Sequence, residues 1–228
     1  MTRMFHKVTR TWNIITGCHH NCVYCWARRM AKRLHKTEKY REGFKPRFHP
    51  KELNVRFRAG EFVFVCDMGD MFGHWVPTPW IIKVLEVIKK NSQATFLLLT
   101  KNPARYLEFS PYLRTLRNVI AGATIETDDD AIYSNISNAP KPSTRIEAMK
   151  LLDGVRKMVS VEPVLAFSNK FADKIAEINP EFVYVGYDNY NNKLPEPPLN
   201  RVKKLIEELR NRGITVYEKT LRKAWWET

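Results

Sequence analysis

Short runs of consecutive apolar residues recur along the chain, and segments with helical periodicity separate them. Runs of four to seven apolar residues are typical of strands buried on both faces. Six such runs occur, at residues 62–65, 95–99, 119–125, 158–161, 182–185 and 214–217. The helical segments between them cover residues 79–90, 103–116, 144–152, 170–178 and 199–212. An opening strand is predicted around residues 8–15, and a first helix from about residue 26 to residue 36.

Strands that alternate with helices predict an α/β fold of parallel βα units with right-handed crossovers. Six or seven such units are too few for a typical eight-unit barrel. The pattern Thr144-x-x-Glu147 indicates a capping box at the start of one helix. Residues 37–60 are basic, interrupted by prolines and poorly periodic. We interpret them as an irregular insertion over the mouth of the barrel, or as a substrate arm.

The composition is that of a folded globular protein, with 44% hydrophobic and 12% aromatic residues in a chain of 228. The N-terminal residues lack the apolar stretch of a signal peptide. No apolar run reaches the roughly 18 residues that a membrane span needs. We therefore expect a cytoplasmic protein without a membrane partner, and a monomer.

The charge is strongly basic and unevenly distributed. The formal net charge is +14, and residues 1–60 carry 15 basic against three acidic side chains. The densest stretch covers residues 28–36, and aromatic residues are interleaved with the basic residues that follow it, at Tyr40, Phe44, Phe48 and Phe57. This pattern predicts a polyanionic partner, such as DNA or RNA. The alternative is a solvated helix face.

Three cysteines lie within eight residues, with three residues between Cys18 and Cys22 and two between Cys22 and Cys25. Three thiolates can bind three irons of a [4Fe–4S] cluster and leave the fourth iron open for a substrate. A ferredoxin closes all four positions, and structural zinc has four closed ligands. Other interpretations are a disulfide with an odd thiol, a chance spacing, or a zinc site completed by His19, His20 or Cys66.

The same spacing resembles the Cys-x-x-x-Cys-x-aromatic-Cys signature of the radical S-adenosylmethionine (SAM) superfamily, with Tyr24 as the aromatic residue. The resemblance implies that SAM binds the open iron and that one electron cleaves it to a 5′-deoxyadenosyl radical. Tyr24 would lie against the adenine. It also implies a partial (β/α)6 TIM-like barrel over residues 1–220, open on one side and with an extra C-terminal strand. Residues 221–228 would form a tail.

Residues that end the predicted strands complete the implied SAM site, since barrels of this kind form their sites at the carboxyl ends of strands. Met68, Gly69 and Asp70 occupy the position of a Gly-Gly-Glu motif that holds the SAM amino group. Their sequence departs from that motif, and an ordinary turn is the alternative. Lys101 follows three leucines at a position where spore photoproduct lyases carry a Thr-Lys pair, so it could pair with the SAM carboxylate. Otherwise it is a solvated loop lysine.

Two acidic residues and one cysteine complete the set. Thr124 and Glu126 end the fourth strand and are assigned to the SAM site, whereas Glu162 ends the fifth and is assigned nearer the substrate. Pairing with Arg145 or Lys219, or simple solvation, is the alternative for each acid. Cys66 is a candidate hydrogen-atom donor, by resemblance to the spore photoproduct lyases. A buried core cysteine is the alternative.

A narrower resemblance covers nearly the whole chain. It is to phage and prokaryotic radical SAM-like proteins of unassigned function, and it departs at residues 185–190, where the substrate would bind. The matching segments are Trp12-Asn13-x-x-Thr16-Gly17-Cys18, Asp70-Met71-Phe72, Leu99-Thr100-Lys101-x-Pro103-x-Arg105, Ser160-Val161-Glu162-Pro163 and Lys219.

The sequence therefore predicts a radical SAM enzyme that abstracts hydrogen from a large anionic substrate. Nucleic acid is favoured over a peptide because of the basic N-terminal region. The chemistry requires a [4Fe–4S] cluster, SAM and an external one-electron donor such as a ferredoxin or flavodoxin. The rival from another class is a non-catalytic nucleic-acid-binding protein stabilised by zinc or by a structural cluster. A barrel that keeps the cluster but serves as a partner protein is a third possibility.

Overall fold

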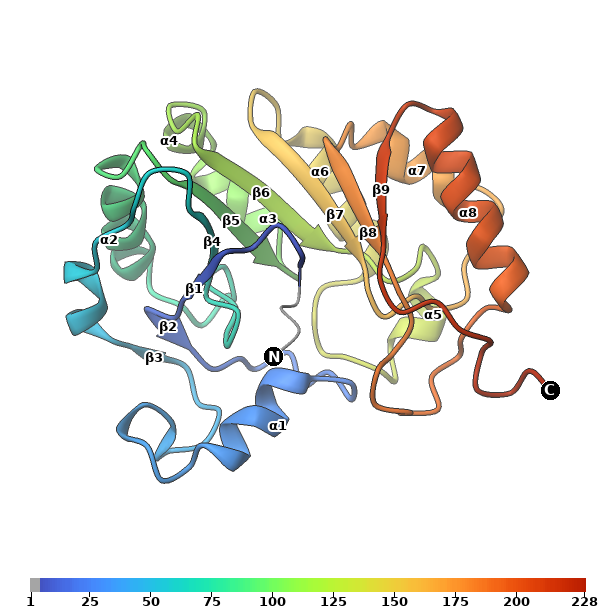
Figure 1. Ribbon diagram of the computed structural model, residues 1–228, viewed down its shortest axis with the longest axis horizontal. Helices are drawn as coiled ribbons and strands as arrows, with labels where there is room; N and C mark the ends of the chain where they lie inside the picture. The colour runs from blue at the N-terminus through green and yellow to red at the C-terminus, as the bar shows by residue number, and fades with distance from the viewer. Residues whose placement is uncertain (1–4) are drawn as a thin grey trace.

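The fold is a curved, open sheet of seven parallel strands with helices on its convex face (Figure 1). It is seen in a computed structural model that describes residues 5–228. The strand order is β1-β4-β5-β6-β7-β8-β9, so each successive strand of this sheet is added beside the strand that precedes it in the chain. The strands are β1 (Arg10–Trp12), β4 (Phe62–Val65), β5 (Thr95–Thr100), β6 (Val119–Thr124), β7 (Arg156–Val161), β8 (Phe182–Val185) and β9 (Thr215–Glu218).

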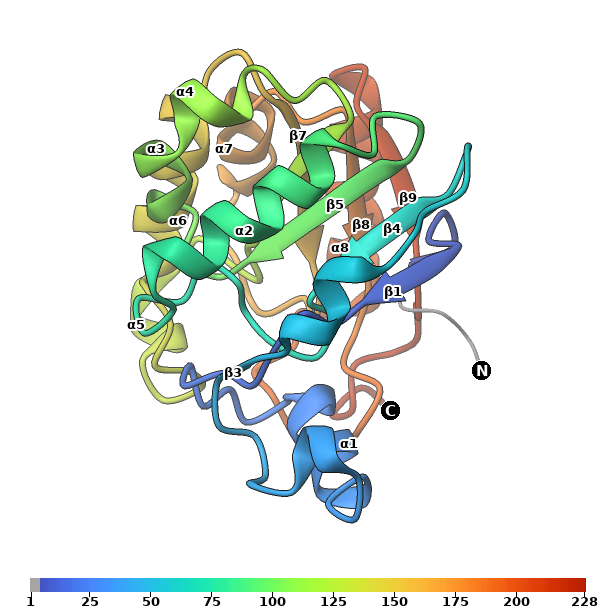
Figure 2. The ribbon, with the colours of Figure 1, turned by 90° about the vertical axis from the view of Figure 1, so that its left-hand side faces the viewer.

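The helices pack along the outside of this sheet, as the side view shows (Figure 2). Those between the strands are α2 (Thr78–Lys89), α3 (Ala104–Glu108), α4 (Ser110–Leu113), α5 (Asp130–Tyr133), α6 (Pro142–Leu151), α7 (Phe171–Glu177) and α8 (Leu199–Asn211). The predicted partial barrel is confirmed, including its extra C-terminal strand β9. Among residues 5–228, no helix is long and apolar enough to cross a bilayer.

Alternate residues of each strand point to two different cores. In β6, Ala121 and Ala123 join the large core under the helices, whereas Ile120 faces the concave side. The concave side is filled by a smaller apolar cluster that includes Phe5, from the segment before β1. The amino-terminal part of the barrel interior is therefore packed with side chains, and the polar groups gather at the carboxyl ends of the strands.

Some local predictions were wrong. The segment 103–116 forms two short helices, α3 and α4, because Pro111 lies in the first turn of the second. Helix α6 begins at Pro142, two residues before the expected start, and no side chain caps it. Thr144 and Glu147 therefore lie inside the helix, and the capping box does not form. Proline is favoured in the first turn of a helix, which explains the earlier start.

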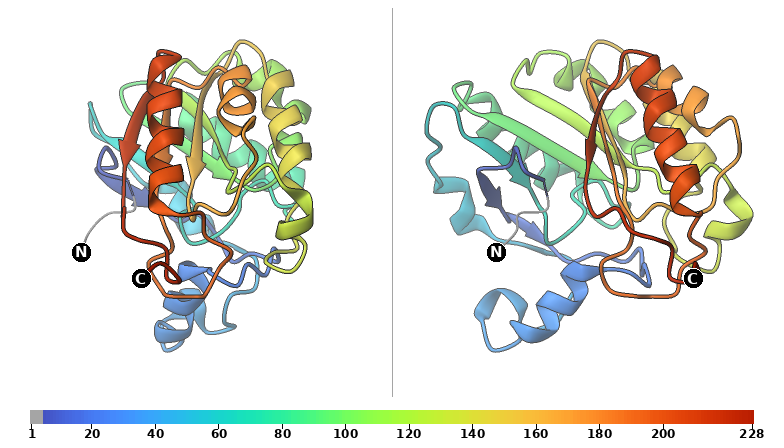
Figure 3. Two further views of the ribbon diagram at one scale, coloured as in Figure 1. Left: turned by 90° about the vertical axis from the view of Figure 1, so that its right-hand side faces the viewer. Right: turned by 45° about the vertical axis from the view of Figure 1, so that its right-hand side comes forward.

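The segment after the cysteines projects from the carboxyl end of the sheet (Figures 1 and 3). It comprises α1 (Trp26–Arg33) and the short 3-10 helix Glu38–Tyr40, whereas the next 3-10 helix, Pro50–Asn54, packs against α2. A two-stranded antiparallel sheet of β2 (Ile15–Thr16) and β3 (Arg47–Phe48) joins it to the barrel. The predicted irregular insertion at residues 37–60 is thus largely irregular in the structure.

Candidate active site

The three clustered cysteines lie on the loop between β2 and α1, and all are free thiols. The amide of His20 donates to Cys18 Sγ at 3.4 Å, and that of Arg28 donates to Cys25 Sγ at 3.4 Å. The Cys25 side chain thereby caps the N-terminus of α1. Cys22 Sγ lies 3.0 Å from the Ser137 hydroxyl. Such hydrogen bonds to sulfur are among the contacts that tune an iron–sulfur cluster.

The thiols are near enough to influence one another electrostatically. Burial raises the pKa of Cys18 well above its usual value, Asp70 adds to the effect, and the Cys22 and Cys25 thiolates raise it further. Among residues 5–228, no group of three or more His, Cys, Asp or Glu side chains is arranged to hold a single metal ion. A [4Fe–4S] cube does not require convergence on one point, because each thiolate binds a different iron. The donor set therefore fits a three-cysteine cluster.

Two of the three residues considered as a fourth zinc ligand, His20 and Cys66, are engaged elsewhere, whereas His19 is exposed. His20 is buried and its Nε2 lies 2.9 Å from Asp70 Oδ2. Cys66 is also buried, in the large core beside the backbone of Ile14 and Ile15. A tetrahedral zinc site with one of these as its closing ligand would have to break this packing.

The turn after β4 lies against the start of the cysteine loop. Gly17 and Gly69 form a parallel bridge, and the Gly17 amide donates to the Met68 carbonyl at 2.9 Å. A Cβ at Gly17 would lie 2.2 Å from the Lys45 carbonyl oxygen, and its φ is +83°, so only glycine suits this position. The Asn13 side chain accepts from the Met68 amide at 3.0 Å. The turn predicted to hold the SAM amino group is thus in register with the loop predicted to hold the cluster.

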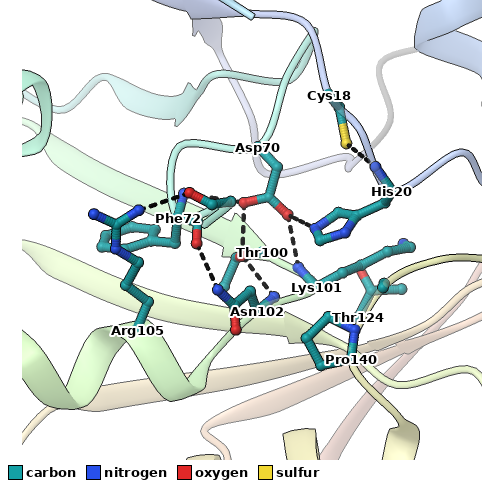
Figure 4. A network of polar contacts seen from close by, with 12 residues as sticks. Cys18, His20, Asp70, Phe72, Thr100, Lys101, Asn102, Arg105, Thr124 and Pro140 are labelled. Atoms are coloured by element: carbon teal, nitrogen blue, oxygen red, sulfur yellow. Dashed lines mark hydrogen bonds and ion pairs between the residues drawn. The ribbon is translucent and has the colours of Figure 1, made fainter. Parts of the chain in front are cut away.

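The Asp70 carboxylate connects this turn to the end of β5 (Figure 4). It accepts hydrogen bonds from the Thr100 hydroxyl at 2.7 Å and from the amides of Phe72 and Lys101 at 3.0 Å each. His20 contacts its other side. Burial would raise the pKa of Asp70, but the His20 contact and the other hydrogen bonds lower it below its usual value. Asp70 therefore acts as a structural anchor, with its side chain turned into this network.

Asp70→Asn is expected to loosen the cysteine loop. The NH₂ group of asparagine would face either the Lys101 amide or the Thr100 and Phe72 donors. The charged acceptor would be lost, and at least one of these donors would face another donor. We expect a loss of about 1.5–3 kcal/mol in the free energy of unfolding, with faster hydrogen exchange in residues 17–22. Chemical denaturation and exchange mass spectrometry would measure these changes. Unchanged exchange in the loop would contradict the anchoring role.

The polar cluster around Glu126 lies at the same edge of the sheet. Its buried carboxylate accepts from Arg145 Nη1 at 2.7 Å and from the Tyr24 hydroxyl, and Lys101 Nζ lies 3.3 Å away. Burial would raise the pKa of Glu126, but Arg145 and Lys101 outweigh it and lower the pKa to about 2. Burial would lower the pKa of Lys101, yet Glu126 raises it above its usual value. Both groups are therefore charged at neutral pH.

This cluster joins the cysteine loop to the sheet. Tyr24 stands between two of the three cysteines, and its ring lies under the ammonium of Lys101, 5.3 Å from the centroid. Thr124, also predicted in the site, is buried, and its carbonyl accepts from Arg145 at 2.8 Å. Four of the predicted residues, Tyr24, Lys101, Thr124 and Glu126, therefore come together from three separate parts of the chain.

Two buried polar atoms near this cluster have no hydrogen-bond partner within the described chain. They are Arg145 Nη2 and Ser160 Oγ. Ser160 pairs in register with Thr124 in the neighbouring strand. Buried polar atoms are usually hydrogen-bonded, so unpaired ones beside Thr124 favour a polar ligand in this part of the barrel.

Glu162 lies at the end of β7 and pairs with Lys219 from the end of β9, with 2.6 Å between Oε2 and Nζ. Both side chains are mostly buried. Burial raises the pKa of Glu162, and Lys219 and then Lys101 partly offset the shift. The pairings with Arg145 and Lys219 that the sequence left as alternatives are therefore present for both acids. Lys101 nevertheless influences both, so the two acids face one region.

Cys66 lies apart from that region. It is 2% exposed, it packs among the apolar residues of the large core, and its backbone has φ of +59°. Burial raises the pKa of its thiol to about 12. The environment is that of the core cysteine that the sequence left as an alternative.

Sequence reasoning did not find Tyr133 and Ser137. The Tyr133 hydroxyl donates to Glu126 at 3.4 Å and its ring lies under Arg145, 4.3 Å from the guanidinium carbon. Ser137 contacts Cys22 and also donates to the His20 carbonyl at 3.2 Å. Both belong to the segment between β6 and α6, where no apolar run or motif singled them out.

Comparison with known proteins bears first on family and fold. The family model described as "Protein of unknown function (DUF5131)" matches residues 4–188. No curated protein matches the chain significantly by sequence. Spore photoproduct lyase complexed with dinucleoside spore photoproduct superposes with a TM-score of 0.61 at 12% identity, covering 92% of this chain and 76% of that one.

SuiB of Streptococcus suis is a second structural relative. Bound to its precursor peptide SuiA, it superposes with a TM-score of 0.60 at 10% identity, covering 92% of this chain. Bound to S-adenosylmethionine, it gives a TM-score of 0.56 at the same identity. The chain spans about half the length of SuiB, 48% and 50% in the two structures. These likenesses show that the chain shares the fold of both proteins.

Proposed function

The chain belongs to the DUF5131 family of proteins of unknown function, and within that family we propose that it is a radical SAM enzyme. One observation carries the proposal. The aromatic residue before the last of three free cysteines, Tyr24, is hydrogen-bonded to Glu126 at the carboxyl edge of the sheet. The loop that would hold the iron–sulfur cluster is thereby joined to a buried group of charged side chains that suits a polar cofactor.

Cys18, Cys22 and Cys25 would hold a [4Fe–4S] cluster. With SAM bound, the cluster would supply one-electron cleavage of the sulfonium and a 5′-deoxyadenosyl radical. The protein would contribute binding, orientation and the exclusion of side reactions. Its loop is suited to this because the amides of His20 and Arg28 already donate to two of the sulfurs.

The remaining residues would bind SAM. Backbone groups of Met68 and Gly69 lie beside the cysteine loop and could hold the SAM amino group, while Asp70 fixes the turn. Lys101, charged and mostly buried, could pair with the SAM carboxylate. The Tyr24 ring could lie against the adenine, and the Glu126 carboxylate and the Thr124 hydroxyl could accept ribose hydroxyls.

The substrate we propose is nucleic acid, bound from the basic N-terminal side. Glu162 and Lys219 would line the substrate end of the site, since they lie across from Lys101 at the ends of β7 and β9. Cys66 would take part only if the turn after β4 exposed its thiol. Because SuiB shares the fold and binds a precursor peptide, a peptide is the alternative substrate that the experiment has to distinguish from nucleic acid. A ferredoxin or flavodoxin would supply the electron.

The reaction class is tested by anaerobic reconstitution with iron and sulfide, followed by dithionite and SAM. We expect 5′-deoxyadenosine in excess of the amount formed without protein. Single-stranded DNA, duplex DNA, RNA and an acidic peptide are then added separately. The yield of 5′-deoxyadenosine should rise only with the class of molecule that is the substrate. A protein that binds iron but forms no 5′-deoxyadenosine under any of these conditions would refute the proposal.

A further inference from the structure

The outer face of α1 and the residues that follow it carry cations without anionic partners. Arg28, Arg29, Lys32, Arg33 and Lys36 form no ion pair with any described residue, and no Asp or Glu occurs between residues 21 and 37. Lys32, Arg33 and Lys36 are exposed. Further along the segment, Lys39 and Arg47 are paired with Glu52 and Glu42. The unpaired cations of α1 and of Lys36 therefore form a basic surface that directly follows the cysteine loop in the chain.

Exposed aromatic rings adjoin this helix. Among the described residues, the exposed aromatic side chains are Tyr190, Trp225 and Trp226, each between 43% and 48% exposed. Tyr190 belongs to the loop after β8, and the guanidinium of Arg29 lies 4.8 Å from the centroid of its ring. Arg29 also donates to the Asn192 side chain. The loop after β8 is thus held against α1.

The two tryptophans continue the same surface. Lys193 lies over the Trp225 ring at 4.7 Å from the centroid. The indole N–H groups of Trp225 and Trp226 donate to the carbonyls of Leu194 at 2.6 Å and of Glu196 at 3.0 Å. Their polar edges are therefore satisfied within the protein, and the rings are fixed in place while nearly half of each side chain stays exposed.

Unpaired cations beside fixed, exposed rings suit a particular polyanion. Single-stranded nucleic acid offers phosphates to a basic groove and bases that stack on aromatic rings, whereas a duplex keeps its bases stacked inside. An acidic peptide would satisfy the cations but would leave the rings without a matching flat partner. The arrangement therefore favours an unpaired strand over both.

We propose that α1, the loop 186–198 and the C-terminal tail form a binding track for single-stranded DNA or RNA. Phosphates would lie along Lys32, Arg33 and Lys36, and bases would stack on Tyr190 and Trp225. The track leads past the cysteine loop, so a bound strand would present a base at the mouth of the barrel. That the bound nucleic acid is the substrate rests on the proposed function, whereas the binding of single-stranded nucleic acid does not.

The test is fluorescence anisotropy of the reconstituted protein with labelled oligo(dT), oligo(U), a duplex of equal length and polyglutamate, over a range of salt concentrations. We expect preference for the single strands. Lys32→Gln/Arg33→Gln should lower the slope of log affinity against log salt by about 2, because two phosphates would no longer be neutralised. Lys89→Gln/Lys90→Gln is the matched control, because it removes two exposed cations that form no ion pair with a described residue. They end α2 where the chain enters the amino end of β5, opposite the end from which α1 projects, so the slope should be unchanged.

Stacking is tested separately. Tyr190→Ala should weaken single-strand binding roughly 5- to 150-fold, and Tyr190→Phe should restore it. Equal affinity for duplex and single strand, an equal effect of the α2 control, or preference for polyglutamate would overturn the proposal. Because SAM cleavage is measured without a strand as well as with one, and strand binding is measured without SAM, failure of the track is distinguishable from failure of the radical SAM assignment.

Discussion

Replacing Cys18 with alanine is expected to remove the iron–sulfur cluster and, with it, all formation of 5′-deoxyadenosine. Only two thiolates would remain for a cube that needs three protein ligands to leave one iron open. Reconstituted wild-type protein should hold about four irons per chain, with a visible absorbance that dithionite bleaches. The variant should hold well below one. Iron and sulfide analysis, with product quantification by mass spectrometry, would measure both effects.

The matched control is the fourth cysteine. Cys66→Ala removes a thiol that lies in the large core, away from the other three, so iron content should match that of the wild type. A small loss of stability is expected because the alanine packs less well. If Cys18→Ala kept a full complement of iron, or Cys66→Ala lost it, the assignment of the cluster ligands would be wrong.

Glu126→Gln is expected to destabilise the fold by about 3–5 kcal/mol, because it leaves Arg145 and Lys101 as buried cations without their anion. The Glu126 and Arg145 side chains are both 0% exposed, so water cannot replace the missing charge. The Tyr24 hydroxyl would also be left without a charged acceptor. Urea denaturation of the apoprotein would measure the change in the free energy of unfolding.

A surface pair provides the comparison. Arg156 and Glu181 form an ion pair of the same chemistry, 2.7 Å between Nε and Oε1, but their side chains are 43% and 39% exposed. Glu181→Gln should therefore cost less than about 1 kcal/mol, since solvent screens such pairs. Similar losses of stability for the two variants would mean that water reaches the Glu126 cluster and screens its charges.

The sequence predicted the sheet well because its central strands, β5 to β8, are largely buried on both faces. Each continuous apolar run, such as residues 62–65 and 182–185, became a parallel strand in chain order. Helix boundaries were less predictable, because they depend on which of several local signals prevails. At α6 the proline at 142 prevailed over the Thr144 capping pattern, and Pro111 divided the helix expected at 103–116.

The candidate site was predictable where it depends on local spacing. The cysteine motif, and polar residues such as Lys101 and Glu126 directly after apolar runs, could be read from the sequence since strand ends share one edge. Arg145 could be named only as an alternative partner for the acids, and two further partners were missed. Tyr133 and Ser137 lie on irregular or helical segments whose approach to the cysteine loop depends on tertiary packing. The burial of Cys66 likewise follows from the left-handed turn after β4, which the residues alone did not indicate.

The central claim is that one iron of a three-cysteine cluster is open to SAM. Electron–nuclear double resonance on the dithionite-reduced protein, with SAM labelled at its amino nitrogen and carboxylate oxygens, examines that iron directly. We predict hyperfine coupling from both labels and a shift of the cluster signal when SAM is added. A cluster whose spectrum is the same with and without labelled SAM would contradict the claim, since no open coordination position would then be available.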